Sequence, residues 1–268
     1  GSTLLCMWVV RYSEREGERK TRNPMSASVT SPGRVVLYYD VCSPYSYVGF
    51  FLLRRLRALW QQRAIRTGES VPQVELRPIF LGGIMKATGN QPPAKLPSKG
   101  RYLASDMRGQ TQYFSLPFTF PADFFGAVTS SLGAQRLLTA VQRTRSPAEV
   151  EQVSVALYER IWQRDEDIRE PESLLASCKA AGLSEDAAKD LVSMISDSDV
   201  KQALMDATNE AIEMGMFGAP FFVCYKGDTR EPLMLFGSDR FHLLADYFGL
   251  PLSLADLRSP EPVLQAKL

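Results

Sequence analysis

The pattern of apolar and polar residues predicts a strand, helix, strand unit early in the chain. Residues 34–40 (RVVLYYD) form a nearly continuous apolar run, which is typical of a central strand buried on both faces. Apolar residues then recur at helical spacing behind a serine and a proline, which predicts a helix from Ser43 to about residue 62. The alternating stretch at 73–80 predicts a second strand. By the handedness rule this unit is a right-handed parallel crossover, so the fold begins as α/β.

The rest of the chain divides into a helical block and a return to strands. Residues 82–100 are rich in glycine and proline, which predicts a long irregular connection. From about residue 102 to residue 216 the apolar spacing is helical, and no convincing strand interrupts it. Strand character returns at 221–225 and 233–236, and a last helix is predicted to open at Ser238.

This order of elements predicts an α/β fold in which an all-helical domain is inserted into a thioredoxin-like sheet. The predicted thioredoxin-like domain is discontinuous and comprises residues 34–85 and 217–268, and the inserted helical domain comprises residues 86–216. Residues 1–33 mix arginine, glutamate and serine without apolar periodicity, so we expect a flexible N-terminal extension there. Two lobes arranged in this way are expected to form one cleft.

Composition and charge narrow the classes of function. The chain carries 31 Lys and Arg against 30 Asp and Glu, so neither nucleic acid nor an acidic membrane is an expected partner. The apolar run at 4–10 is too short to cross a bilayer, which takes about 20 residues, so no membrane insertion is expected. The four cysteines lie far apart, with no Cys-x-x-Cys pair and a single histidine, His242, which disfavours a metal site. His242 itself lies in an apolar helical stretch, which disfavours a catalytic role.

The sequence Ser43-Pro44-Tyr45-Ser46 stands at the predicted junction of the first strand and the first helix, where a thioredoxin-type enzyme carries Cys-Pro-x-Cys. Unpaired amides and the helix dipole at such a terminus favour an anion. With serine in both cysteine positions, a disulfide cannot form there, so a reacting sulfur has to arrive with a ligand, and glutathione is the obvious carrier. The alternatives are that Ser43 only caps the helix, and that Cys42 is the nucleophile.

Two later segments extend this predicted site. Pro220 directly precedes a predicted strand, where a cis-proline would place the main chain of Ala219 beside the first helix; an ordinary trans proline at the start of a strand is the alternative. Ser238, Asp239 and Arg240 offer a hydroxyl, a carboxylate and a guanidinium, which suit a zwitterionic amino acid, although a capping serine in the first turn of a helix is equally compatible with them.

Taken together, the segments YYDVCSPYSYVGF, GGIMKATGNQPPAKLPSKGRYLASDM, MGMFGAPFFV and MLFGSDR resemble the kappa-class glutathione transferases, from about residue 34 to the C-terminus. The resemblance implies that Ser43 stabilises the glutathione thiolate and that Pro44 and Tyr45 adjoin it. It implies further that Ala219, before cis Pro220, pairs with the cysteinyl main chain. The remaining implied contacts are Asn90 and Lys99 for the glycine end, Ser238, Asp239 and Arg240 for the γ-glutamyl end, and Asp106 reaching that end from the partner subunit of a homodimer.

The resemblance also implies an activity, namely conjugation of glutathione, as co-substrate, to small electrophiles such as halonitroarenes, with peroxidase activity as a further possibility. Two alternatives stay open: a glutathione-dependent isomerase of the hydroxychromene-carboxylate type, and a non-catalytic thioredoxin-like binding module. The last three residues, Ala266-Lys267-Leu268, are a one-residue variant of the peroxisomal address Ser-Lys-Leu. We therefore expect a peroxisomal location, with the mitochondrion as the second site at which the family occurs.

Overall fold

A short strand followed by a long helix forms the frame of the molecule, as the apolar pattern predicts. The computed structural model describes residues 33–227 and 231–258. Strand β1 spans Arg34–Tyr39, helix α2 spans Pro44–Thr67, and strand β2 spans Gln73–Pro78. The helix is longer than predicted and ends at Gly68, whose left-handed backbone (φ 71°) directs its N–H to the carbonyl of Ala64.

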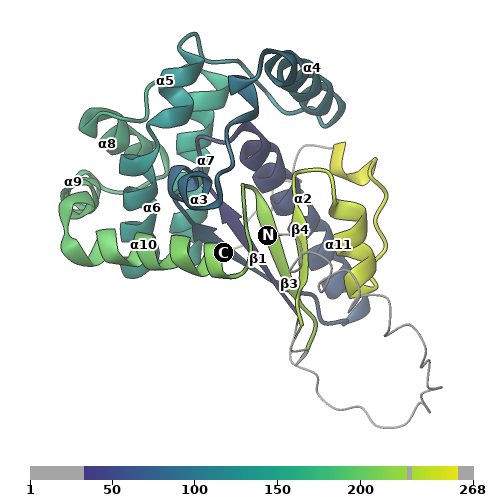
Figure 1. Ribbon diagram of the computed structural model, residues 1–268. Helices are drawn as coiled ribbons and strands as arrows, with labels where there is room; N and C mark the ends of the chain where they lie inside the picture. The colour runs from purple at the N-terminus through teal and green to yellow at the C-terminus, as the bar shows by residue number, and fades with distance from the viewer. Residues whose placement is uncertain (1–32, 228–230, 259–268) are drawn as a thin grey trace. The chain divides into compact units, whose positions relative to one another are not determined.

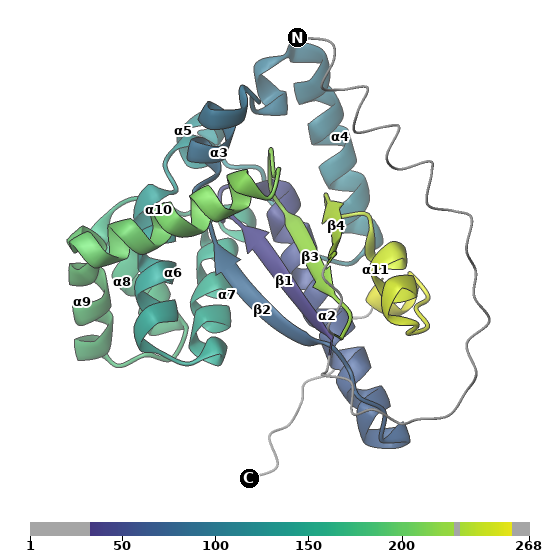
Figure 2. The same ribbon diagram turned by 60° about the horizontal axis from the view of Figure 1, so that its bottom comes forward.

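Four strands form one mixed sheet in the order β2-β1-β3-β4; Figure 1 shows the sheet among the helices, and Figure 2 labels all four strands. Strands β1 and β2 are parallel, which confirms the predicted parallel pairing. Strands β3 (Phe221–Tyr225) and β4 (Leu233–Phe236) are antiparallel neighbours, and β3 runs antiparallel to β1. The register pairs Tyr38 with Phe221, so the end of β1 meets the start of β3.

Each face of the sheet belongs to a different apolar cluster, because successive side chains of a strand point to opposite faces. Val35, Leu37 and Tyr39 belong to the larger cluster, to which α2 also contributes, together with α7 (Pro147–Gln163) and α11 (Phe241–Phe248). Val36 and Tyr38 belong to the smaller cluster, with residues of α3 (Leu81–Thr88) and α10 (Ser198–Glu213). Figures 1 and 2 show α10 and α11 at opposite sides of the sheet.

Between β2 and β3 the described chain is helical, as predicted. Besides α3, α7 and α10, this block contains short 3-10 turns at Pro93–Lys95 and Met194–Ser196 and the helices α4 (Pro97–Tyr113), α5 (Phe124–Thr129), α6 (Leu132–Thr144), α8 (Pro171–Ala180) and α9 (Glu185–Ser193). The predicted order of strands and helices is therefore confirmed. The domain boundaries stay a prediction, and the one between residues 85 and 86 falls inside α3. The C-terminal tripeptide and all but the last residue of the predicted N-terminal extension lie outside the described residues.

Two sequence predictions about element boundaries are wrong. Residues 82–100 are not an irregular connection, because α3 and the start of α4 occupy much of the segment. The ring of Phe80 lies over the glycines of α3, and a Cβ added at Gly82 would come within 2.8 Å of it, so these glycines permit close packing rather than breaking the helix. The last helix opens at Phe241 and not at Ser238.

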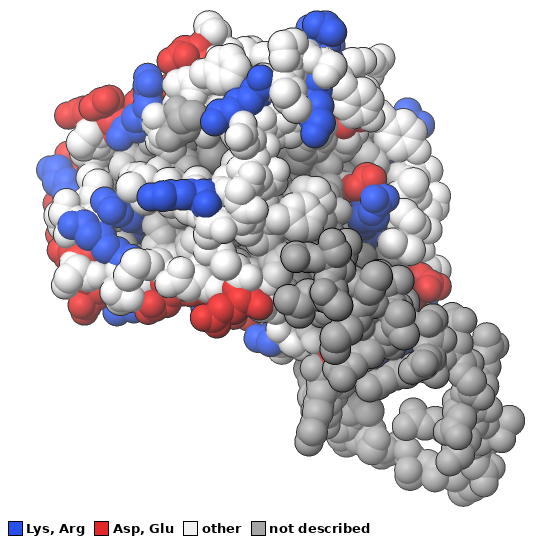
Figure 3. All heavy atoms as spheres, in the orientation of Figure 1, with Lys and Arg blue, Asp and Glu red and all other residues white. Residues whose placement is uncertain are grey.

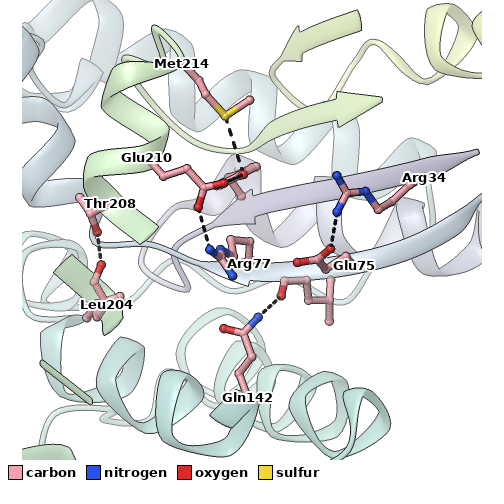
Figure 4. A network of polar contacts seen from close by, with 10 residues as sticks. Arg34, Glu75, Arg77, Gln142, Leu204, Thr208, Glu210 and Met214 are labelled. Atoms are coloured by element: carbon pink, nitrogen blue, oxygen red, sulfur yellow. Dashed lines mark hydrogen bonds and ion pairs between the residues drawn. The ribbon is translucent and has the colours of Figure 1, made fainter. Parts of the chain in front are cut away.

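A polar network ties α10 to the sheet (Figure 4). The carboxylate of Glu210 accepts a hydrogen bond from the Tyr38 hydroxyl at 2.9 Å and pairs with Arg77 of β2 at 2.7 Å. Gln142 of α6 points toward β2, where its side-chain amide donates to the carbonyl of Leu76 at 2.9 Å. These contacts join the sheet to the helical block.

The charged side chains of both signs are interspersed on the face shown in Figure 3, as the near-equal counts of acidic and basic residues lead one to expect. None of the helices in the described part of the chain is both long and apolar enough to span a bilayer.

Candidate active site

Ser43 is the N-cap of α2 and has extended backbone dihedral angles (φ −88°, ψ 119°). Its Oγ accepts a hydrogen bond from the Ser46 N–H at 3.1 Å, and Pro44 takes the first helical position. Pro44 has no N–H to leave unpaired, and its fixed φ suits the helix. The long helix therefore directs the positive end of its dipole at the Ser43 hydroxyl.

The predicted cis-proline is confirmed: the peptide bond between Ala219 and Pro220 is cis. The Ser43 hydroxyl donates to the Ala219 carbonyl at 3.1 Å, which joins two residues far apart in the sequence. Helix α2 comes close to the proline because it carries a glycine at this point; a Cβ on Gly49 would lie 3.1 Å from Pro220 Cγ. The serine and the Ala219 main chain thus lie together, as predicted.

Two neighbouring side chains that compete with Ser43 for a chemical role are buried. The Cys42 thiol is buried in the smaller apolar cluster, and burial, reinforced by the carboxylate of Asp40, raises its pKa well above the ordinary value. Cys42 is therefore a neutral thiol near pH 7. Ser46 is fully buried, and its hydroxyl has no hydrogen-bond partner in the described structure. Of the three side chains, that of Ser43 has the geometry of a donor to a ligand anion.

A chain of hydrogen bonds connects α2, α4 and the loop after β4. The Tyr45 hydroxyl donates to Asp106 Oδ2 at 2.9 Å, and Gln110 Nε2 donates to the same oxygen at 2.8 Å. Gln110 Oε1 in turn accepts from the Ser238 hydroxyl at 2.9 Å. Burial and the hydrogen bond to Asp106 raise the pKa of Tyr45, so its hydroxyl is a permanent donor at neutral pH. The structure therefore brings together three predicted site residues: Tyr45, Asp106 and Ser238.

Gln110 is the member of this chain that sequence reasoning missed. It lies one helical turn after Asp106 on α4, and this spacing is the only sequence signal that could have pointed to it. Asp106 and Gln110 also help to line a shallow hollow on α4, together with Tyr102, Ser105, Gly109, Tyr113 and Phe114. Asp106 makes these contacts within its own chain, and its predicted reach into a partner subunit stays a prediction.

The segment after β4 differs from the prediction in its relation to α11. Ser238 and Asp239 precede this helix, whose N-cap is Arg240 without a side-chain cap bond. Arg240 Nη1 pairs with the carboxylate of Asp239 at 3.1 Å, and both side chains are exposed. The Gly237 N–H donates to the Pro220 carbonyl at 3.1 Å, which places the start of this segment next to the cis-proline.

The two residues predicted for the glycine end differ in their contacts. Asn90 Nδ2 donates to the Phe217 carbonyl at 2.7 Å, so Asn90 lies beside the segment that leads to Ala219. Phe217 packs its ring on that of Phe236 at 4.6 Å, and both rings are partly exposed near this point. Lys99 lies in the first turn of α4 and is exposed, and within the described residues its side chain makes no ion pair or hydrogen bond.

The site consists of a hydroxyl at a helix terminus, the main chain of Ala219 beside it, and the charged side chains of Lys99, Asp239 and Arg240 on neighbouring segments. Within residues 33–227 and 231–258, histidine, cysteine and carboxylate side chains form no group suited to hold a metal ion. The arrangement can hold an extended peptide along Ala219 and place an anionic atom of it against Ser43.

Comparison with known proteins adds a finding independent of this geometry. A family model described as the DSBA-like thioredoxin domain matches residues 34–249. The human protein named glutathione S-transferase kappa 1 is 41% identical over 221 residues, which cover 81% of this chain and 92% of the human one. A Caenorhabditis elegans protein of the same name is 31% identical over 225 residues, covering 83% and 94% of the two chains. A 2-hydroxychromene-2-carboxylate isomerase structure, 24% identical, superposes with a TM-score of 0.60 over 80% of this chain and 94% of that one.

Proposed function

Since this chain belongs to the DSBA-like thioredoxin family and, within it, to the glutathione S-transferase kappa proteins, we propose that it is a glutathione transferase in which Ser43 holds the thiolate of bound glutathione. The observation that carries this assignment is the position of the Ser43 hydroxyl, at the N-terminus of α2 and 3.1 Å from the main chain of Ala219. The relatives at 41% and 31% identity support the activity. The isomerase, at 24% identity, shares the fold, and no observation in this chain favours its reaction.

The free energy available at this position is sufficient to ionise a thiol. A free thiol with a pKa of about 8.5 is mostly protonated at neutral pH, and lowering this pKa by about two units takes about 2.7 kcal/mol. A hydrogen bond to a charged group contributes about 1.5–3 kcal/mol, and a helix terminus adds about 0.3–1 kcal/mol or more when it is partly buried. Ser43 and α2 can therefore supply the shift without a histidine.

The other predicted residues align the tripeptide. The main chain of Ala219 pairs with the cysteinyl residue of glutathione as a strand edge does. Ser238, Asp239 and Arg240 bind the γ-glutamyl end, Tyr45 adjoins the thiolate, and Asn90 and Lys99 bind the glycine carboxylate. Two contacts support this direction of binding: Asn90 bonds to Phe217, before Ala219 in the chain, and Gly237, next to Ser238, bonds to Pro220, after it.

Conjugation then follows from the ionised sulfur. The thiol proton leaves to solvent on binding, and the thiolate forms a carbon–sulfur bond with the electrophile. When the electrophile is a halonitroarene, the halide leaves with the bonding electron pair. The Ser43 hydroxyl stays protonated throughout, because it donates a hydrogen bond and does not act as a base.

The test is a direct measurement of the bound thiol. We expect glutathione to bind with a new thiolate absorbance near 240 nm at pH 7, and we expect turnover with 1-chloro-2,4-dinitrobenzene to give the conjugate. Binding with the thiol still protonated, or turnover that returns glutathione unchanged from a chromene carboxylate, would contradict the transferase assignment. A lack of glutathione affinity would favour a non-catalytic binding module.

Two further properties are part of this proposal. The protein forms a homodimer in which Asp106 of one chain approaches the γ-glutamyl end held by the other, and the particle mass in solution is then twice the chain mass of 29.9 kDa. Its location is the peroxisome, through Ala266-Lys267-Leu268, with the mitochondrion as a second site. Light scattering tests the first property. Microscopy of an N-terminal fluorescent fusion, with and without the last three residues, tests the second.

A further inference from the structure

Residues 40–43 connect β1 to α2, and we call them the active-site loop because they end at Ser43. Loops usually satisfy their backbone groups with solvent, but this loop is buried and its backbone is bound by protein groups instead. The Cys42 N–H donates to Asp40 Oδ1, and the Ser43 N–H donates to the Asp40 carbonyl, both at 3.1 Å. The carboxylate of Asp40 also accepts from the Leu81 N–H at 2.9 Å and from the Ser131 hydroxyl at 3.0 Å.

The helical block holds the side chain of Asp40 through Leu81 and Ser131, and it holds the main chain of the loop at Val41. The Val41 N–H donates to Gln135 Oε1 of α6 at 3.3 Å, and its carbonyl accepts from Trp162 Nε1 of α7 at 2.8 Å. Both polar groups of one peptide residue, two positions before Ser43, are thus bound by side chains of the segment between β2 and β3. Gln135 and Trp162 are both fully buried, so water does not compete for these bonds.

Gln135 also binds the ends of the two parallel strands. Its Nε2 donates to the carbonyl of Tyr39 at 2.9 Å and to the carbonyl of Ile79 at 2.7 Å, where β1 and β2 have just ended. The same side-chain amide therefore fixes the position of the loop relative to both parallel strands. A side-chain amide suits this pattern, because one side chain must donate twice and accept once.

We propose that Gln135 and Trp162 are positioning residues for the ionisation of glutathione: by holding Val41 from two helices, they set where the Ser43 hydroxyl stands relative to Ala219. This inference rests on the proposed function. The residues that bind the two ends of the tripeptide lie on other segments, after β4 and around α4. Loss of the Val41 contacts should therefore change the pKa and the reactivity of the bound thiol more than the affinity for glutathione.

The experiment compares Trp162→Phe with Trp60→Phe. Trp162→Phe removes one indole donor but keeps an aromatic ring to stack on Phe118, at a centroid distance of 5.7 Å in the wild type. Trp60 is equally buried in the larger cluster, and its Nε1 has no hydrogen-bond partner in the described structure, so Trp60→Phe is the matched control. The second pair is Gln135→Met and Gln142→Met, because Gln142 is also on α6 but bonds to β2 at Leu76, away from the loop.

The readouts are the pH titration of the bound thiolate absorbance, kcat and KM for glutathione at pH 6.5, and thermal unfolding as a check of folding. We expect Trp162→Phe to raise the pKa of the bound thiol toward that of free glutathione and to lower kcat about tenfold, with KM changed less than about twofold. Gln135→Met should have the larger effect of the same kind. Trp60→Phe and Gln142→Met should keep the wild-type thiol pKa.

An unchanged thiol pKa and kcat in folded Trp162→Phe would overturn the inference, whether or not Gln135→Met folds. Equal shifts in the test and control variants would also overturn it, because the effect would then be general loosening of the fold. The proposed function fails separately, and takes the inference with it, if the wild-type protein does not bind and ionise glutathione.

Discussion

Ser43 differs from its neighbours in the hydrogen bonds that its side chain makes. Cys42 and Ser46 lie within three residues of it, yet one is a buried thiol with a raised pKa and the other is a fully buried hydroxyl. Ser43 has both a donor and an acceptor bond, to Ala219 and from Ser46. The chemistry of the site therefore depends on which of these three side chains, Cys42, Ser43 or Ser46, faces the cis-proline.

Replacing Ser43 by alanine removes the hydroxyl that we propose as the donor to the bound sulfur. We expect conjugation at pH 6.5 to fall about 10- to 100-fold, which corresponds to the loss of a hydrogen bond to a charged group. The free energy of unfolding should fall by about 1 kcal/mol, because the N-cap of α2 is lost as well. Steady-state kinetics and chemical denaturation measure the two effects.

Ser46→Ala is the control for that variant, because the Ser46 hydroxyl makes no hydrogen bond of acceptable geometry within the described part of the chain. It should retain wild-type kinetics and stability. A loss of activity in Ser46→Ala as large as that in Ser43→Ala would contradict the assignment of Ser43.

Cys42 should be chemically inert in the folded protein. Burial raises its pKa well above the ordinary value, and it raises the pKa of Cys178 to about 11 and that of Cys224 to about 12. At pH 7.5 we expect alkylation by iodoacetamide at these three positions only after denaturation, as read by peptide mass spectrometry. Rapid labelling of Cys42 in the native protein, with loss of activity, would return the nucleophile role to it.

At the scale of elements, the site is assembled from helix and strand ends that the sheet brings together. The end of β1 meets the start of β3, so Ser43 and Ala219 lie side by side although the whole helical block separates them in sequence. Helix α4 adds the bond chain from Tyr45 through Asp106 and Gln110 to Ser238, which links three separate segments.

Gln110→Leu breaks this chain at its centre. Ser238 loses its acceptor and Asp106 loses one donor, so the γ-glutamyl end of glutathione should be bound less tightly. We expect the Kd for glutathione to rise about fivefold to tenfold, as for the loss of one hydrogen bond, with the pKa of the bound thiol unchanged. Calorimetric titration and the thiolate absorbance check the two statements. A shifted thiol pKa with an unchanged Kd would assign Gln110 to the reacting centre instead.

The sequence predicts these elements well where one apolar pattern decides them. The run at 34–40, the serine and proline before α2 and the return of strands at 221–236 all have local causes, and all are confirmed. Gly82 and Gly83 led to the wrong prediction of an irregular connection. They lie within helix α3, where they leave room for the ring of Phe80 to pack over them. Gln110, Gln135 and Trp162 could not be predicted as partners of the site, since their contacts join segments far apart in the sequence.

At the scale of the whole molecule, one buried carboxylate joins the sheet, the active-site loop and the helical block. Asp40 is fully buried, and burial raises its pKa above the ordinary value of 3.8, although hydrogen bonds from Leu81, Cys42 and Ser131 oppose the shift. The folded protein therefore binds this proton more tightly than the unfolded chain does. Between pH 3.8 and the folded pKa, ionisation of Asp40 costs stability as the pH rises.

Comparison with Asp40→Asn isolates this effect. The free energy of unfolding of the wild type, minus that of the variant, should decrease as the pH rises from about 4 and level off above the folded pKa of Asp40. Urea denaturation at a series of pH values measures the difference. A difference that increases with pH would mean that the hydrogen bonds outweigh burial and that the carboxylate is preferentially ionised in the folded state.

The hydrogen bond from Ser43 to the Ala219 carbonyl has a consequence for the end of the catalytic cycle. A thiolate competes well for that hydroxyl, because hydrogen bonds to charged acceptors are stronger than those to a carbonyl. The thioether of a conjugate is only a weak acceptor, so once the carbon–sulfur bond has formed, we expect the Ser43 hydroxyl to donate to the Ala219 carbonyl again. Because the Ala219 carbonyl competes for this hydroxyl, we expect the conjugate to be bound less tightly than the thiolate, which favours release of the product.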